Sequence, residues 1–285
     1  MDRNGLRTLQ MVEMKLLREV DSICRSLNIK YYLIGGTLLG AVRHGGFIPW
    51  DVDIDIAMLR NDYEIFRKYC IERDNEEFFF EDYSTEKNHS ECHAIFKIRN
   101  TEIRWASRNK DRYPVTNKGI YLDIFPLDYA PNDCKKQKRQ QRKIKFLSSL
   151  LQAKVCRDYG SGKGVYCVKK MLGFILRPVS FSTIQKIVDK EMQKYNNGEC
   201  EYIVSMASHY SYYKQLMPFD YYGTPVKIQF EDGLFYAPAK THEYLKKLFG
   251  DYMQLPPEET RYELLNALEY VDYGKCNLSE EYHDQ

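Results

Sequence analysis

Three aspartates alternate with apolar residues in the segment Asp51-Val52-Asp53-Ile54-Asp55. In a β-strand, alternate side chains share a face, so Asp53 and Asp55 would lie about 7 Å apart. Without a cation such carboxylates repel, and at least one pKa is expected to rise. With a third aspartate from a neighbouring strand they could hold Mg²⁺, and we expect two ions, with Mn²⁺ as the alternative. The segment therefore predicts metal-dependent phosphate chemistry.

A glycine pair, Gly35-Gly36, stands upstream of the aspartates and is followed by Thr37. Glycines let a backbone approach phosphates closely, and the N-terminus of the following helix would present free N–H groups. Alone, a glycine pair is usually a turn, and alternating aspartates at a strand end are often only solvated. The order of strand, glycine pair, short helix, loop and aspartate strand makes the combination informative.

The elements that must position these residues can be predicted from hydrophobic periodicity. Apolar residues at helical spacing predict an amphipathic helix over residues 5–27, and a tyrosine-rich run predicts a strand over 30–34. We expect a short helix over residues 37–42, a loop over 44–50, and the aspartate strand over 52–58. Asn61-Asp62 is expected to cap a helix that runs to Tyr69.

Further strands are predicted at 78–83, 94–99 and 119–125, with Asp123 and Asp128 near the end of the last one. Residues 29–130 would then form an α/β unit with a mixed or antiparallel sheet. A hairpin is predicted over 226–236 with Asp232-Gly233 as its turn, followed by a helix over 242–249. We therefore predict an α+β fold in which helices flank a mixed β-sheet.

Residues 135–190 differ in composition, with roughly fifteen Lys and Arg against Asp158 and Asp189. Helical spacing of the apolar residues predicts two or three basic amphipathic helices, broken near residues 159–162 and at Pro178. This region could be a solvated helical face, bind a polyanionic acceptor polymer, or rest on an anionic membrane surface. The chain would divide into a catalytic core at 1–130, a basic helical insertion at 131–200, and a part at 201–285 that completes the core.

The bulk properties exclude several classes of protein. The formal net charge of +2 is too small to predict a nucleic acid partner. The eight cysteines include no C-x-x-C pair, the N-terminus has no apolar signal segment, and no apolar run is long enough to cross a membrane. We expect free thiols and a cytoplasmic protein, with peripheral contact to the inner face of the plasma membrane as an alternative.

The segment from Gly35 to Ile56, which reads GGTLLGAVRHGGFIPWDVDIDI, closely resembles the LicD family of phosphotransferases, within the nucleotidyltransferase superfamily. Two later segments are similar to the same family: YLDIFPLD at residues 121–128, and GDYM with LPP at residues 250–257. The resemblance covers roughly residues 5–130 and the C-terminal third. In that family the residue corresponding to Val52 is typically an aspartate. On a strand, residue 52 would point away from Asp53 and Asp55, so we expect an active enzyme.

The resemblance implies a nucleotidyltransferase-like fold and transfer of phosphocholine, or a similar phospho-alcohol, from CDP-choline or a related CDP-alcohol. Fukutin-type proteins share this domain and use a CDP-polyol. The acceptor would be a sugar hydroxyl of teichoic acid, capsule or lipopolysaccharide, free or lipid-linked. By this resemblance Asp53 and Asp55 are catalytic metal ligands and Asp51 a further one. Asp123 is the third ligand, or the base for the acceptor proton, with Asp128 in reserve.

Gly35, Gly36, Thr37 and Arg43 are the residues we expect at the donor phosphates, Arg43 through its planar fork. A surface ion pair is the alternative for Arg43, and packing in the loop is the expectation for His44. Lys97 and Arg99 share a strand face and would either reach the diphosphate or be solvated. Trp50, Trp105 and the tyrosines could form a cage for a quaternary ammonium, although core or sugar-binding roles suit most of them better.

Two other functions fit the same motifs. A nucleotidyltransferase would move a nucleoside monophosphate from an NTP and release pyrophosphate, whereas the LicD reaction releases CMP. A catalytically inactive glycan-binding homologue would show no metal-dependent affinity for the donor.

Overall fold

The apolar stripe in the N-terminal segment forms helix α1 (Arg3–Leu27), whose inward face is buried. This computed structural model describes residues 3–73, 77–85, 96–107, 119–155, 163–261 and 268–272. The stripe of α1 packs on β4 (Phe96–Ser107) and β5 (Gly119–Ala130), and the helix also contacts α3 (Arg60–Glu72). The helix predicted over 5–27 is therefore confirmed, and it covers the strands that surround the aspartates.

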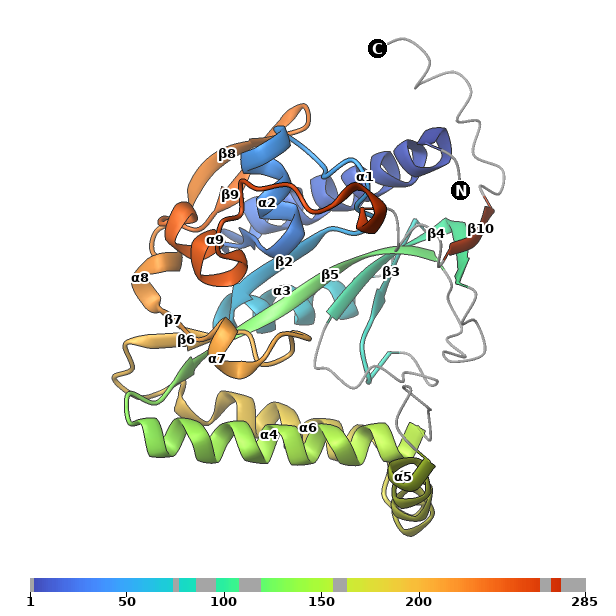
Figure 1. Ribbon diagram of the computed structural model, residues 1–285, viewed down its shortest axis with the longest axis vertical. Coiled ribbons are helices and arrows are strands. Elements are labelled where there is room, and N and C mark those ends of the chain that lie inside the picture. The colour runs from blue at the N-terminus through green and yellow to red at the C-terminus, as the bar shows by residue number, and fades with distance from the viewer. Residues whose placement is uncertain are drawn as a thin grey trace.

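Among the described residues, eight strands form one mixed sheet whose main path runs β1-β2-β5-β4-β10. Strand β1 (Tyr32–Leu33) is antiparallel to β2 (Asp55–Leu59), β2 is parallel to β5, and β5 is antiparallel to β4. Both β3 (Phe78–Glu81) and β10 (Leu268–Asp272) pair with β4. The predicted α+β class, with helices flanking a mixed sheet, is confirmed (Figure 1).

Three helices lie between β5 and the next strand of the sheet along the chain, namely α4 (Cys134–Val155), α5 (Lys163–Ile175) and α6 (Phe181–Met192). In Figure 1 the long α4 runs beneath the sheet, with α6 alongside and α5 at one end. After η2 (Gln193–Tyr195), β6 (Tyr202–Val204) pairs with the end of β5, and β7 (Met217–Pro218) pairs with β6. The basic helices predicted within 135–190 are confirmed, and the division of the chain at residues 130 and 200 stays a prediction.

The C-terminal part begins with the short helices α7 (Tyr212–Gln215) and α8 (Phe219–Tyr222). The hairpin of β8 (Val226–Phe230) and β9 (Gly233–Ala237), helix α9 (Thr241–Phe249) and η3 (Glu258–Thr260) follow. The hairpin contacts α2 (Gly35–His44) and β1, and α9 contacts α2 as well. This part of the chain therefore packs around the glycine-containing helix that follows β1.

Several predicted boundaries were wrong. Helix α2 begins at Gly35 rather than Thr37, because the Leu38 N–H already bonds the Ile34 carbonyl (3.1 Å). Gly35 enters this turn with a left-handed φ of +56°. Strand β2 begins at Asp55 rather than Val52, so Asp51 and Asp53 lie in the preceding loop. Strands β4 and β5 also extend further than predicted, to Ser107 and Ala130.

Two predicted turn residues have other roles. Helix α3 begins at Arg60, and the Asp62 carboxylate does not cap it but accepts a hydrogen bond from the Lys30 backbone N–H (3.0 Å). The hairpin turn is centred on Glu231-Asp232, with Glu231 at a φ of +54° and Gly233 already in β9. The Glu231 carboxylate bonds the Phe47 N–H (2.9 Å) and the Arg7 guanidinium (2.5 Å). These contacts hold the turn in its left-handed conformation.

Arg60 joins the sheet to the basic helices. Its side chain is 5% exposed and forms an ion pair with the fully buried Asp128 of β5 (2.5 Å) and a second with Asp189 of α6 (2.8 Å). Asn196 donates a further hydrogen bond to Asp128 (2.6 Å). Buried charges are tolerated only when paired in this way, so the cluster ties α3, β5 and α6 together.

Among the described residues, no helix has the length and apolar character needed to cross a bilayer. The described cysteines, Cys24, Cys70, Cys134, Cys167 and Cys200, are free thiols, and the other three lie outside the described residues.

Replacement of Arg60 by Met should lower the free energy of unfolding by about 3–5 kcal/mol, because it leaves the Asp128 carboxylate buried without its cation. Urea unfolding would measure the loss. The control, Lys240→Met, breaks a surface pair with Asp220 and should leave stability nearly unchanged. Equal, small effects of both substitutions would show that the buried cluster does not stabilise the helical layer.

Candidate active site

Strand pairing brings two aspartates and a lysine into one row. In the register of the sheet, Asp55 of β2 is directly opposite Asp123 of β5, and Asp123 is directly opposite Lys97 of β4. Neighbouring strands are about 4.8 Å apart, so the three side chains are cross-strand neighbours. Lys97 donates a hydrogen bond to the Asp123 carboxylate, forming an ion pair. The structure thus brings together Asp55 and Asp123, which are 68 positions apart in the sequence.

The other two aspartates reach the row from the loop before β2. The Asp51 carboxylate accepts a hydrogen bond from the Val52 backbone N–H (3.2 Å). It also shares a side-chain hydrogen bond with Asp53. The loop continues the pairing of β2, because the Asp123 N–H donates to the Ile54 carbonyl (3.1 Å). Val52 packs against the hydrophobic core, as its predicted orientation requires. The alternation of the segment survives although only Asp55 belongs to the strand.

The first turn of α2 faces these carboxylates. A Cβ on Gly36 would stand 2.6 Å from the Asp51 Oδ2, and one on Gly35 would stand 3.4 Å from the Asp55 Oδ2. The Thr37 hydroxyl accepts a hydrogen bond from the Asp55 N–H (2.9 Å). The positive end of the helix dipole favours negative charge at this place. Three of the four residues predicted for donor binding, Gly35, Gly36 and Thr37, therefore lie beside the aspartates.

Glu13 of α1 is a fifth carboxylate at this site. It is 1% exposed, and its charge interacts with those of Asp53, Asp51, Asp55 and Asp123. One turn earlier, the Gln10 amide donates to the Asp51 carbonyl (3.0 Å), so this stretch of α1 is fixed against the aspartate loop. Sequence reasoning missed Glu13, although a signal existed. It stands four residues after Leu9 and three before Leu16, within the apolar stripe of the helix.

Burial and mutual repulsion raise the pKa values of this cluster. Burial, followed by the charge of Asp53, raises the pKa of Asp51 well above its usual range. The pKa of Asp55 rises well above its usual range through burial and the charges of Asp53, Asp123 and Asp51, with Lys97 opposing. Burial also raises the pKa of Asp53, while the hydrogen bond from Asp51 and the charges of Lys97 and His209 lower it. The site therefore lacks enough positive charge to balance its carboxylates.

Among the described residues, no three Asp, Glu, His or Cys side chains are arranged so that they could hold a metal ion as they stand. The aspartates are held in pairs instead, Asp51 with Asp53 and Asp123 with Lys97. The donor set nevertheless suits a hard divalent cation, because carboxylate oxygens converge at a place where positive charge is deficient. Assignment of Asp51, Asp53, Asp55 and Asp123 as metal ligands stays a prediction.

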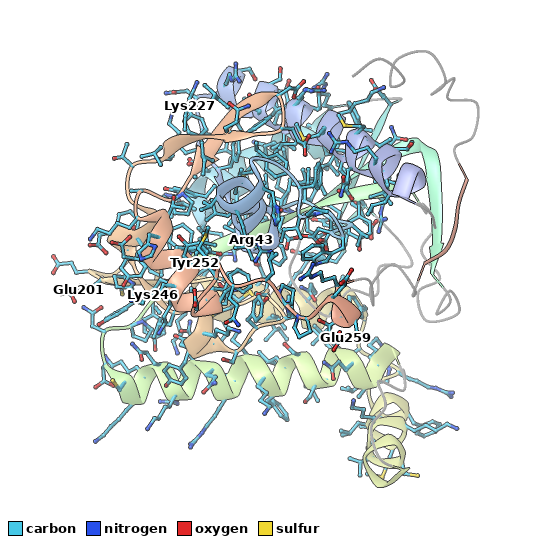
Figure 2. The ribbon with its side chains drawn as sticks, turned by 45° about the horizontal axis from the view of Figure 1, so that its top comes forward. Arg43, Glu201, Lys227, Lys246, Tyr252 and Glu259 are labelled. Carbon is cyan, nitrogen blue, oxygen red and sulfur yellow. The ribbon has the colours of Figure 1, made fainter. Side chains whose placement is uncertain are left out.

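A second group of side chains gathers at the far end of α2. The Arg43 guanidinium donates to the Tyr252 carbonyl (3.1 Å) and to the His44 ring (3.0 Å), and Figure 2 shows Arg43 beside Tyr252. Trp50 lies edge-on to His44, and Arg261 covers its indole ring at 5.3 Å. Burial, followed by the charge of Arg261, lowers the pKa of Arg43. Two arginines and an indole are thus concentrated at this end of α2. Among the described residues Arg43 forms no ion pair, so the alternative of a surface ion pair is not seen.

Lys97 and Arg99 were predicted either to reach the diphosphate or to be solvated. Both side chains are buried, so the prediction of a solvated face was wrong. Arg99 is 4% exposed and is bonded to the Glu81 carboxylate and to the Gly119 carbonyl (2.9 Å). Lys97 stands over the Tyr121 ring at 3.9 Å and contacts Asp123. Of the two, Lys97 is placed at the carboxylates. Asp128, the reserve carboxylate, lies five residues after Asp123 and so points to the opposite face of β5, where it pairs with Arg60.

The segment between β6 and α7 adds residues that the sequence did not predict. Burial lowers the pKa of His209, and the nearby Asp53 charge opposes that shift. The charges of Asp55, Asp51 and Asp53 act on Tyr210, whose ring packs edge-on against Phe249 at 6.2 Å. Tyr244 of α9 accepts a hydrogen bond from the Gly35 N–H (3.2 Å). Of the tyrosines considered for a cage, Tyr210 therefore lies by the aspartates, and the Trp105 side chain lies outside the described residues.

Comparison with known proteins matches this chain to one protein family and to several individual proteins. Residues 28–152 match the family described as LicD/FKTN/FKRP, nucleotidyltransferase domain. The lipopolysaccharide cholinephosphotransferase LicD of Haemophilus influenzae is 32% identical over 265 residues, covering 91% of this chain and 95% of that protein. Human ribitol 5-phosphate transferase FKRP is 44% identical over 45 residues, which cover 16% of this chain and 9% of that protein. An uncharacterized protein of Rickettsia prowazekii is 30% identical over 138 residues, covering 47% of this chain and 48% of that protein.

Substitution of Asp51 by Asn should stabilise the metal-free protein at pH 7.5 by more than about 1 kcal/mol, because it removes one repelling charge and keeps the hydrogen bonds. A carboxyl group whose pKa is raised in the folded state destabilises that state at every pH above its unfolded pKa, because folding then makes it either take up a proton or stay ionised beside like charges. The gain should therefore be absent below the unfolded pKa of about 4 and grow as the pH rises.

Urea unfolding in EDTA between pH 4 and pH 8 would measure this difference. Asp220→Asn, at the surface, serves as the control. A gain of the same size at both pH limits, or a loss at every pH, would show that repulsion among the aspartates does not act on stability.

Proposed function

The chain belongs to the LicD family, and on that basis we propose that it is a Mg²⁺-dependent transferase of phosphocholine or a similar phospho-alcohol. The donor would be CDP-choline or a related CDP-alcohol, the acceptor a sugar hydroxyl of a cell-surface glycan, and the released product CMP. The observation that supports this most strongly is the row of Asp55 and Asp123 on adjacent strands, completed by Asp53 from the loop.

Most of the carboxylates would bind the metal ion, and one of them could act on the acceptor hydroxyl. Asp53 and Asp55, with Asp51, would hold Mg²⁺, and Mn²⁺ could replace it. The bound cation would supply charge stabilisation to the transferring phosphoryl group. Asp123 would either complete the ligand set or accept the proton of the acceptor hydroxyl. Because Lys97 is bonded to Asp123, it would hold that carboxylate in place.

The donor diphosphate would lie along the first turn of α2. The N-terminal N–H groups of this helix would bind the anion. The missing side chain at Gly36 lets the Asp51 carboxylate, a proposed metal ligand, lie against the same turn. Arg43 lies at the far end of α2 and donates to the Tyr252 carbonyl. Its role at the donor phosphates, through its planar fork and with Arg261 as a second cation nearby, therefore stays a prediction. Catalysis would then rest on positioning and electrostatic stabilisation of the transferring group.

The relatives support the class of reaction. The Haemophilus protein that this chain matches over most of both lengths is named for cholinephosphotransfer to lipopolysaccharide, and the human relative for transfer of ribitol 5-phosphate. Both names describe the transfer of a phosphorylated alcohol. On this basis we propose that this chain also transfers a phosphorylated alcohol to a glycan. The product analysis below identifies which alcohol and which sugar.

Product analysis tests the proposal. The purified protein should be incubated with Mg²⁺, a panel of CDP-alcohols and glycan acceptors, and separately with NTPs. We expect CMP from one of the CDP-alcohols, in an amount equal to the phospho-alcohol found on the glycan. Pyrophosphate from an NTP would identify a nucleotidyltransferase instead, and absence of metal-dependent donor binding would identify an inactive homologue.

Substitution of Asp53 or Asp55 by Asn should lower CMP release by at least about a thousandfold, because each variant loses a charged ligand while the shape of the site is kept. Circular dichroism should show an unchanged fold. Asp220→Asn, at the surface, should retain full activity. Full activity in either active-site variant would contradict the assignment of these aspartates.

A further inference from the structure

Glu13 is buried without a complete set of hydrogen bonds. Its Oε2 atom has no hydrogen-bond partner among the residues that the structure describes, although the side chain is 1% exposed. A buried carboxylate oxygen without a partner is unfavourable for folding, and a charged one is more so. Such a group in a packed interior calls for an explanation, such as a role with an ion or a ligand.

The surroundings of Glu13 point to the active-site carboxylates. The charges that act on it are those of Asp53, Asp51, Asp55 and Asp123, in that order of size. The neighbouring Gln10 is bonded to the backbone of the aspartate loop, at Asp51 (3.0 Å) and Ile48 (3.5 Å). Helix α1 thus presents Glu13 to the loop and not to solvent. Hydrophobic packing alone would favour an apolar residue at this place in the stripe.

We infer that Glu13 belongs to the cation-binding centre and contributes a carboxylate oxygen, directly or through a water molecule, when the divalent ion is bound. This inference rests on the proposed function, because it assigns a further residue to the same metal site. It also gives α1 a role in the reaction centre beyond covering the sheet. Helix α1 lies before residue 28, where the match to the family begins.

Thermal unfolding with and without Mg²⁺ or Mn²⁺ tests this inference. Glu13→Gln keeps the size of the side chain and removes the charge, so the metal-free variant should unfold at the same temperature as the wild type or higher. Its affinity for the ion, measured by calorimetry, should fall by about 10–100-fold. The matched control is Glu19→Gln on the same helix, which alters a surface pair with Arg73 and should leave ion affinity unchanged.

The outcomes separate this inference from the proposed function. Wild-type protein that binds neither ion would overturn both. Ion binding by the wild type and equally tight binding by Glu13→Gln would overturn only the role of Glu13. A metal-free Glu13→Gln protein that unfolds at a lower temperature, with unchanged ion affinity, would show that Glu13 acts in packing alone.

The surface of α4 carries a group of exposed cations that lies apart from the active site. Helix α4 contains no acidic residue, and its exposed cations include Lys135, Lys138, Arg139 and Arg142, which line a hollow together with Phe146. Figure 2 shows nitrogen-tipped side chains extending from α4 away from the sheet. The cations therefore form a positive stripe along the N-terminal half of this helix.

Large apolar side chains are exposed beyond the C-terminal end of the stripe, at Phe146 of α4 and on α5. Phe146 is 61% exposed, and on α5 Met171 is 59%, Phe174 65% and Ile175 60% exposed. Helix α5 is packed tightly against the end of α4, since a Cβ on Gly173 would stand 2.5 Å from the Ala153 carbonyl oxygen. Exposed apolar residues next to a basic stripe are the features of a helix that lies in a membrane interface.

We propose that the α4–α5 surface docks on an anionic lipid bilayer. The charge of the stripe complements anionic head groups, and the α5 side chains would enter the boundary of the acyl chains. This contact would bring the active site to acceptors that are attached to lipid. A soluble polyanion would account for the cations but not for the exposed Phe174, Met171 and Ile175.

Co-sedimentation of the full chain with phosphatidylcholine vesicles, with and without phosphatidylglycerol, tests this surface. Only anionic vesicles should bind the protein, and less so at high salt. Lys138→Glu/Arg142→Glu and Met171→Ser/Phe174→Ser should each weaken binding by at least about tenfold. The control Lys246→Glu/Lys247→Glu, on exposed positions of α9, should bind like the wild type.

Three results would overturn this proposal. These are absence of binding to anionic vesicles, binding that neither surface variant weakens, and retention on a soluble anionic polysaccharide by a protein that does not bind vesicles. The last result would identify the stripe as a site for a polyanionic acceptor.

Discussion

Repulsion between carboxylates is the constraint on which the site depends. Five carboxylates are held together here, those of Asp51, Asp53, Asp55, Asp123 and Glu13. Burial and like charge raise the pKa values of Asp51, Asp55 and Glu13. The five carboxylates are positioned by four parts of the fold: the loop before β2, which carries Asp51 and Asp53, the strands β2 and β5, and helix α1. Lys97 and the first turn of α2 supply only part of the opposing charge. A divalent cation, as proposed, would supply the rest.

The remainder of the molecule can be understood as support for that cluster. The parallel pairing of β2 and β5 sets Asp55 opposite Asp123, and the hairpin and α9 hold α2 with its glycines. Arg60 ties the basic helices to the opposite face of β5 through Asp128. The carboxylates of β5 thus serve two purposes, because Asp123 faces the site while Asp128 anchors the helical layer.

Local patterns predicted the helix over 5–27, the mixed sheet, and the proximity of the glycine pair to the aspartates. They succeeded because periodicity and turn residues act over short stretches of chain. Partners fixed by tertiary packing were not accessible. The sequence could not show that Asp128 pairs with Arg60, or that the segment with His209 and Tyr210 reaches Asp53. Glu13 gave a faint signal, as a charge within an apolar stripe, but such a residue is usually only a polar position of an amphipathic helix.

A crystal structure with Mn²⁺ and CDP, located by anomalous scattering, tests the central claim most directly. We predict an anomalous peak bounded by Asp53, Asp55 and Asp123, with Glu13 turned towards it and the diphosphate of CDP at the first turn of α2. A peak elsewhere, or CDP bound in the site with no ion among these carboxylates, would contradict the proposed metal centre.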